Sequence, residues 1–463
     1  MQKAIAKYGL AAHLALLAVA PLVLFPFCAN ATIAVVLLWL SLFGACWILL
    51  GPSVHTGEML HDARRRVMRT VFRDPLFWAF LVVVVVAGLR ALNTGIDMIY
   101  DYERREWSVT DPPLLFLPGS VSNCGLLPFA ASVAAGVVVM GCRKAMGKSA
   151  RMAFLLMASL FSGLAAAVAI LLAAQGDKVV LAAFEHAPER LAGPGAGFAV
   201  YLMCATVAMF AAFERKWNKA MPLVMAAVAG NAAGLFAFLP PLEAVVFAGG
   251  ALLVFLGVFV CAWRTLNGTG EFKLLVVFSI SLVMGGLLVV SAVPEPVVAA
   301  KCNAIVEGVF LPQGFMDIRS RLSAAAFKAW SGSPWAGVGM GAFRFHLRFH
   351  LAQADWAVVP KHVIAVSDGW WQLVVERGIV GVALMALPFG FLLFTYFKRM
   401  VTCIRQMAMP GPAVLLAPVA LAAVAATAFF GSSPLRPEVL VAVGAAFAIS
   451  ANSFPKRRGK ENG

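Results

Sequence analysis

The segment from Arg319 to Gly381 gathers ionisable side chains in a chain that is otherwise strongly apolar. It holds five arginines and three of the seven histidines of the protein, with acids near its end. A guanidinium group presents planar, paired donors that fit phosphate oxygens, and it stays charged. An imidazole or a carboxylate within hydrogen-bond reach can take a proton from a hydroxyl group. The segment therefore contains candidate groups for anion binding and for general base catalysis.

Histidines supply one set of candidates. His346 and His350 are four residues apart and share one face if the segment is helical. That spacing also suits a metal, but HEXXH is absent, and no metal site is predicted. Because Arg344 and Arg348 interleave with the pair, a basic face on anionic headgroups is the simpler interpretation. His362 is a candidate general base, since an unperturbed imidazole titrates near neutral pH.

The run Ser367–Gly381 reads SDGWWQLVVERGIVG and carries two acids. Asp368 is a second candidate base, or a group that orients a hydroxyl. Glu376 either pairs with the next arginine or favours the start of a helix through the helix dipole. Trp370 and Trp371 suit an aromatic membrane belt, and indole rings also stack on sugar faces.

The composition places the chain among polytopic membrane proteins. Of its 463 residues, 62% are hydrophobic and 13% are charged, whereas soluble domains have about 45–50% and about 25%. Eight cysteines are scattered without a CxxC pair, so neither a disulfide framework nor a thiolate metal site is indicated. Since a spanning helix needs about 20 mostly apolar residues, the predicted fold is all-α with about twelve transmembrane helices. These helices start near Gly9, Ala31, Pro75, Ser122, Met152, Gly195, Met221, Leu242, Leu274, Gly378, Pro412 and Glu438.

The first of these helices has an alternative interpretation. Lys3 and Lys7 precede its apolar run, and Ala29-Asn30-Ala31 resembles a signal-peptidase site. The apolar run is longer than a usual signal core, which favours a retained helix.

Lysine and arginine placement predicts that both termini are cytoplasmic. The inner segments then hold 23 of the 37 cations and 6 of the 22 acids. This excess faces anionic lipid headgroups, and no basic patch with interleaved aromatics indicates nucleic acid. The predicted parts are helices one to nine in 1–293, one large periplasmic loop region in 294–377, helices ten to twelve in 378–452 and a cytoplasmic tail in 453–463.

The loop resembles the O-antigen ligase and O-antigen polymerase superfamily. Members of that superfamily have an Arg about fifteen residues before a Pro, then a GvGxGxF turn and an ExGxxG start of the next helix. Here Arg319 lies fifteen residues before Pro334, GVGMGAF follows at Gly337–Phe343, and the last motif ends Ser367–Gly381. The resemblance covers the loop in detail and the whole chain in layout.

The resemblance implies a metal-independent, inverting glycosyltransferase of the bacterial inner membrane that uses no cofactor. The donor would be a glycan on an undecaprenyl-pyrophosphate carrier. The acceptor would be a lipid A-core sugar or another lipid-linked glycan, with membrane lipids around the site.

The resemblance also implies roles for particular residues. Arg190, Arg319 and Arg321 would hold the leaving pyrophosphate, whose charge grows as the glycosidic bond breaks. His362 or Asp368 would act as the base. Trp370, Trp371 and Glu376 would lie on the acceptor side of the loop. For Arg190, at the outer start of the sixth helix, the alternative is an interfacial arginine paired with Glu185 or Glu189.

Two positions depart from the family pattern. Ser367 stands where the family has a histidine, and LPPLEAVVF carries Glu243 where a second arginine is usual. They favour one alternative, an inactive relative that binds or scaffolds glycan-lipid assembly. Another alternative is a lipid-glycan flippase or transporter, which would place ionisable groups near the membrane midplane. The predicted helices have almost none there, and this disfavours ion-coupled transport.

Overall fold

The computed structural model describes most of the chain, with gaps between the described ranges. These ranges are 2–25, 30–50, 68–69, 72–73, 75–93, 95–101, 106–110, 121, 135, 148–175, 188–214, 218–266, 269–308, 315–351, 355, 369–406, 411–429 and 437–451.

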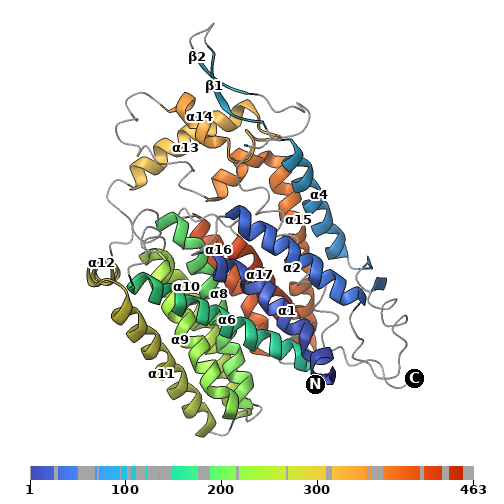
Figure 1. Ribbon diagram of the computed structural model, residues 1–463, viewed down its shortest axis with the longest axis vertical. Helices are drawn as coiled ribbons and strands as arrows, with labels where there is room; N and C mark the ends of the chain where they lie inside the picture. Colours follow the sequence, from blue (N-terminus) through green and yellow to red (C-terminus); the bar gives the residue numbers. More distant parts are fainter. Residues whose placement is uncertain are drawn as a thin grey trace.

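Long apolar helices make up the body of the protein (Figure 1). Seven of the helices in the described ranges are long and apolar enough to cross a membrane, and three more are apolar but shorter. The chain is thus a helical membrane protein. Helices can cross the bilayer because they satisfy all their backbone hydrogen bonds internally. The bundle comprises α1 (Gln2–Leu24), α2 (Asn30–Leu50), α4 (Pro75–Leu92), α6 (Lys148–Ala174), α8 (Pro188–Glu214), α9 (Met221–Phe238), α10 (Pro241–Thr265), α11 (Thr269–Ala292), α15 (Gly369–Arg405), α16 (Leu416–Phe429) and α17 (Pro437–Ala451).

Most predicted helix starts fall within helices of the structure. The exception is the start near Ser122, which lies outside the described residues. The predicted start at Gly378 falls inside α15, at a break in that helix. Two short 3-10 helices, Asn218–Ala220 and Pro412–Leu415, precede α9 and α16.

Helix α8 is the centre of the bundle. It packs against α6, α9, α10 and α17, and its apolar window is 94% buried, against 28% for α11. The hydroxyl of Tyr201 in α8 donates to the backbone oxygen of Ala18 in α1, at 2.8 Å. A helix covered on all sides is held by its neighbours rather than by lipid.

Small residues allow α6 and α9 to cross at backbone contact. A Cβ atom on Gly230 would lie 2.3 Å from the carbonyl oxygen of Gly163. Beside this crossing, Ser162 donates to the side-chain oxygen of Asn231, at 2.8 Å, and the amide of Asn231 donates to the Ser159 carbonyl, at 2.8 Å. Close approach together with polar contacts is a usual way to join membrane helices.

Substitution of Gly230 tests this crossing. Gly230→Ala is expected to lower the stability of the detergent-solubilised protein by about 1–3 kcal/mol, because the added methyl group overlaps backbone that cannot rotate away. The measurement is the midpoint of thermal unfolding. Gly286→Ala is the matched control, since its Cβ would meet nothing within 4 Å. Equal midpoints for the two variants would contradict the close crossing.

Several helix ends meet at one end of the bundle, which we call the loop end. A Cβ on Gly197, near the start of α8, would touch Leu22 at the end of α1 and Glu438 at the start of α17. A Cβ on Gly195 would touch Leu239, directly after α9. The starts of α8 and α17 and the ends of α1 and α9 therefore lie together.

Shorter elements lie at the loop end and beyond it (Figure 1). They are the helices α12 (Glu295–Val306), α13 (Phe315–Gly332) and α14 (Phe343–His350), and the antiparallel strands β1 (Met98–Asp101) and β2 (Glu106–Val109). The predicted loop region 294–377 therefore contains three helices and the first part of α15. The hairpin was not predicted, because its segment reads as acidic and proline-rich.

Lys301 attaches α12 to the bundle. Its Nζ donates to the carbonyl oxygens of Phe236 and Ala237, at 2.5 and 3.1 Å. These carbonyls belong to the last turn of α9, where the helix dipole favours a cation. Burial lowers the pKa of the Lys301 ammonium to about 8.

Candidate functional site

The geometry of the site comes from a layer of three helical segments, which we call the cap layer. It consists of α13, α14 and the first part of α15, residues 369–377. Its apolar core joins Leu322 and Ala326 of α13 with Phe343 of α14 and Val375 of α15. The cap layer therefore has a core of its own, separate from that of the bundle.

Two glycines hold the cap layer against the rest of α15. Gly378 breaks α15 with φ 64° and ψ 177°, a conformation that is open almost only to glycine. Gly337 has φ 77°, and its Cβ would lie 2.5 Å from the nitrogen of Gly378. The GVGMG run thus forms a turn, the glycine turn, which crosses the ERGIVG run at backbone contact.

Backbone hydrogen bonds complete this crossing. The N–H groups of Ile379 and Val380 donate to the carbonyls of Pro334 and Trp335, at 3.0 and 3.2 Å. In return, Val338 donates to the Val375 carbonyl, at 2.9 Å. The break in α15 deprives the N–H groups after it of their helical acceptors. The segment before the turn supplies acceptors instead, since buried backbone groups need hydrogen-bond partners.

Arg319 lies where the cap layer meets the end of α16. Its guanidinium carbon is 4.3 Å from the ring centroid of Phe429, the last residue of α16. One turn earlier, the Ala425 carbonyl accepts a hydrogen bond from Nε1 of Trp370, at 3.0 Å. The last turn of α16 therefore contacts both a predicted pyrophosphate ligand and a predicted acceptor-side residue.

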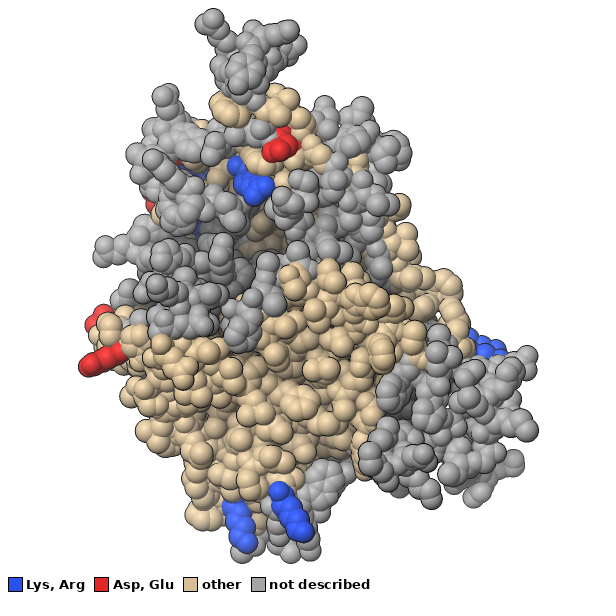
Figure 2. Space-filling view, viewed as in Figure 1, with Lys and Arg blue, Asp and Glu red and all other residues tan. Residues whose placement is uncertain are grey.

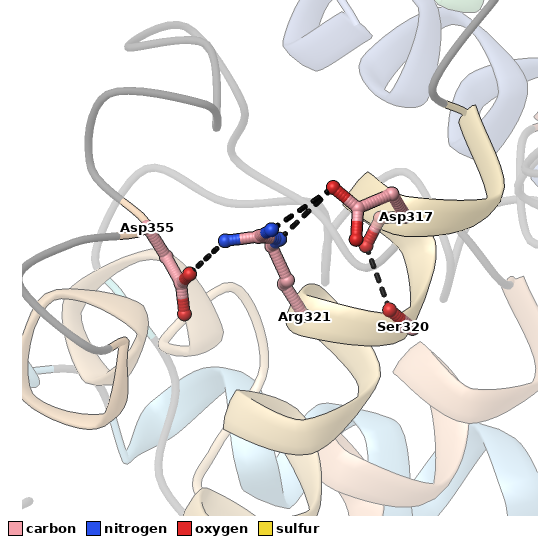
Figure 3. A network of polar contacts seen from close by, with 4 residues as sticks. All are labelled: Asp317, Ser320, Arg321 and Asp355. Carbon is pink, nitrogen blue, oxygen red and sulfur yellow. Dashed lines mark hydrogen bonds and ion pairs between the residues drawn. The ribbon is translucent and has the colours of Figure 1, made fainter.

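Arg321 is engaged by two carboxylates (Figure 3). Its Nε donates to Asp317, one turn earlier in α13, at 3.1 Å, and its Nη1 donates to Asp355. Two acids on one guanidinium leave this cluster with a net negative charge. The arrangement suits Arg321 to holding Asp355 against α13, and its predicted contact with pyrophosphate stays a prediction.

Trp371 belongs to a group of three aromatic side chains. Its ring lies 6.4 Å from Phe327 and 5.9 Å from Trp330, measured between centroids. Its Nε1 donates to the carbonyl oxygen of Ser323, at 3.4 Å. The two neighbouring tryptophans thus have different partners, since Trp370 faces α16 and Trp371 faces α13.

Glu376 is buried beneath the glycine turn, with 7% of its surface exposed. It accepts hydrogen bonds from Gln372, at 3.3 Å, and from the backbone of Gly341. Arg377, also buried, lies against the sulfur atoms of Met340 and Met385. The turn thus folds over Glu376, and this carboxylate fixes the turn in place.

The two histidines of α14 lie on one face, as predicted. Their rings are 6.2 Å apart and nearly parallel. Burial lowers the pKa of His346, and the neighbouring His350 lowers it further. Burial also lowers the pKa of His350, with a contribution from the charge of Lys328. Both imidazoles therefore favour the neutral form.

This pair predicts a loss of stability in acid. A histidine whose folded pKa lies below its unfolded value stabilises the fold at higher pH and loses that contribution as the pH falls below about 6.5. The nearby charge of Lys328 opposes protonation of the pair. The midpoint of thermal unfolding should therefore fall between about pH 7 and pH 5, and less so in a His346→Gln, His350→Gln double variant. Parallel curves for both proteins would contradict this role.

Other predicted site residues are described in part or not at all. His362, Asp368 and Ser367 lie outside the described residues. The backbone of Arg190 is described and forms the first turn of α8, so it lies at the loop end. In the described ranges, no group of three His, Cys, Asp or Glu side chains forms a metal site.

Some members of the site have no distinguishing mark in the sequence. Phe429 is the end of an ordinary apolar helix, and only the folded chain brings it to Arg319. Asp355 likewise meets Arg321 across 34 residues. The i, i+4 spacing of Asp317 and Arg321, in contrast, is typical of an ion pair on a helix and could have been predicted.

Comparison with models of known protein families and with curated proteins finds no match for this chain.

Proposed function

We propose that the chain is a membrane glycosyltransferase. It transfers a glycan from an undecaprenyl-pyrophosphate carrier to a lipid A-core sugar or to another lipid-linked glycan. The observation that carries the proposal is the place of Arg319, a half-buried guanidinium between the cap layer and the end of α16. A carrier embedded in the bilayer presents its diphosphate at the headgroup level, next to the ends of membrane helices.

The distribution of charge supports an extracytoplasmic cap layer. The helix ends opposite the loop end carry many described cations and few acids, and Figure 2 shows basic side chains at that end of the visible face, beyond a broad uncharged surface. Excess lysine and arginine favours the cytoplasmic side. The described cations there include Arg151, Lys219, Arg264, Lys273, Lys398, Arg399 and Arg405, and the described acids are Glu214 and Glu271.

In the proposed reaction, a hydroxyl oxygen of the acceptor attacks the anomeric carbon of the donor with inversion. The bond from that carbon to the pyrophosphate oxygen breaks, and undecaprenyl pyrophosphate leaves. Arg319, together with Arg190 at the start of α8, stabilises the charge that develops on the leaving group. His362 or Asp368 takes the hydroxyl proton. No ATP is needed, because the pyrophosphate linkage is already activated.

A transport function has less support. The described Asp, Glu, Lys and Arg residues that are buried are Glu243, Glu376, Arg377 and Glu438. Glu243 and Glu438 lie in the first turns of α10 and α17, and the other two lie in the cap layer. A transporter places such groups midway across the bilayer, often at broken helices. The arrangement here favours a site on one face.

The test uses a strain of the source organism that lacks this protein. In that strain, Arg190→Ala and Arg319→Ala are expected to leave the defective glycan pattern uncorrected in gel ladders of lipopolysaccharide and capsule. A ligase defect leaves polymerised chain on the carrier, whereas a polymerase defect leaves single repeat units. Lys328→Ala, an exposed change on α13, is the control. If both arginine variants insert normally and restore every ladder, the proposal fails.

A further inference from the structure

Three aromatic side chains of the cap layer form a partly exposed cluster, which we call the aromatic strip. It consists of Phe327 and Trp330 of α13 and Trp371 of α15. Each ring lies 5.8–6.4 Å from the other two, between centroids. Phe327 keeps 55% of its surface exposed although it stands next to two indole rings. A ring that only filled the core would be covered.

The aromatic strip lies on the same side of α13 as Arg319. Residues 319, 323, 327 and 330 follow one another at steps of four, four and three, so they share one side of α13. Phe327 is about 12 Å along the helix from Arg319, at 1.5 Å per residue. The hydrogen bond from Trp371 to the Ser323 carbonyl bridges the interval. A cation and an aromatic surface thus lie in line along one helix.

The charges on α13 limit the kind of ligand that the strip can bind. Asp317 is the acid of this helix, and it forms an ion pair with Arg321. The aromatic strip itself consists of uncharged rings. Aromatic rings carry a negative face, which attracts the C–H groups on the face of a pyranose ring. A surface of this kind suits an uncharged, polyhydroxylated ring that is joined to an anion.

We propose that the aromatic strip binds the sugar rings of the donor, while Arg319 holds the diphosphate to which they are attached. Trp371, which the sequence placed on the acceptor side, then contacts the donor instead. This inference rests on the proposed function and names the subsite for the glycan. The strip then orients the first sugars so that the bond to the pyrophosphate faces the acceptor. Trp330 and Phe327 are binding residues in this view, and neither carries out proton transfer.

The experiment measures binding of two probes to the purified full-length protein in nanodiscs, by microscale thermophoresis. One probe is undecaprenyl pyrophosphate without sugar, and the other bears one N-acetylhexosamine. The wild-type protein is expected to bind the sugar-bearing probe more tightly. Trp330→Ala and Phe327→Ala should each lower the affinity for the sugar-bearing probe by about tenfold. The affinity for the sugar-free probe should not change.

Two further variants act as controls. Trp330→Phe keeps an aromatic ring at this position. It breaks no hydrogen bond, because the buried Nε1 of Trp330 has no acceptor among the described residues. It should retain most of the affinity. Phe349→Ala removes an exposed ring of α14 outside the strip, and it should bind both probes like the wild type. Thermal midpoints of all variants exclude loss of the fold as the cause.

Other outcomes overturn the inference in distinguishable ways. If Trp330→Ala lowers the affinity for both probes equally, the strip contacts the lipid or the membrane interface and not the sugar. If the wild-type protein binds both probes with equal affinity, there is no glycan subsite. If Arg319→Ala nevertheless lowers the affinity for both probes, the diphosphate site remains supported. Binding of neither probe would overturn the proposed function, and the inference would fall with it.

Discussion

Gly378→Ala is expected to detach the cap layer from the rest of α15 and to abolish activity. The glycine has φ 64° and ψ 177°, and holding another residue there costs about 1–3 kcal/mol. The added methyl group would also lie 2.2 Å from the Trp335 carbonyl and 2.5 Å from the Gly337 nitrogen. Both contacts are backbone atoms, which cannot yield without breaking the hydrogen bonds on either side of the break.

The control for this prediction lies in the same helix. A Cβ atom on Gly390 would meet nothing within 4 Å, so Gly390→Ala should be neutral or stabilising by up to about 1 kcal/mol. Thermal unfolding and limited proteolysis of residues 315–377 provide the measurement. A Gly378→Ala protein that is as protease-resistant and as active as Gly390→Ala would show that the crossing does not hold the cap layer.

Arg319→Ala is expected to reduce glycan transfer by about 10²–10³-fold without loss of the protein from the membrane. Removal of one preorganised group that stabilises developing charge has an effect of that size. Arg319→Lys should recover only part of the rate, because an ammonium group cannot make the planar, paired contact with phosphate oxygens. The measurement is the initial rate of product formation with purified donor and acceptor.

Phe429 separates a binding role of Arg319 from a structural one. Phe429→Ala removes the ring under the guanidinium but leaves the charge, so it should weaken transfer less than Arg319→Ala does. Phe429→Tyr should restore the rate. If Arg319→Ala keeps the wild-type rate while Phe429→Ala loses stability, the contact between them holds the fold together and has no part in the chemistry.

Much of the fold could be predicted from hydrophobicity alone. Apolar runs of membrane length predicted the helices of the bundle, since each must satisfy its own backbone in lipid. The glycine turn was also predictable, because three glycines within five residues allow left-handed backbone. Gly337, Gly339 and Gly341 all have positive φ. What the pattern did not reveal is the partner of that turn, Gly378, which follows much later in the chain.

The candidate site was less predictable, because its contacts join distant parts of the chain. Arg319 stood out by type and spacing, yet its neighbour Phe429 is one apolar residue among many. Arg321 carried the same prediction as Arg319, and its contact with Asp355 is evident only in the folded chain. Sequence patterns identify residues that can do chemistry, whereas the surroundings of each guanidinium depend on which neighbours the fold supplies.

The most direct test of the proposed function is reconstitution of the purified protein in liposomes with a glycan on undecaprenyl pyrophosphate and a lipid A-core or lipid-linked glycan acceptor. We expect transfer of the glycan with release of one undecaprenyl pyrophosphate for each bond formed, without ATP, and we expect the reaction to be lost in Arg319→Ala. Intact donor after prolonged incubation of the folded wild-type protein with both acceptors would contradict the proposal.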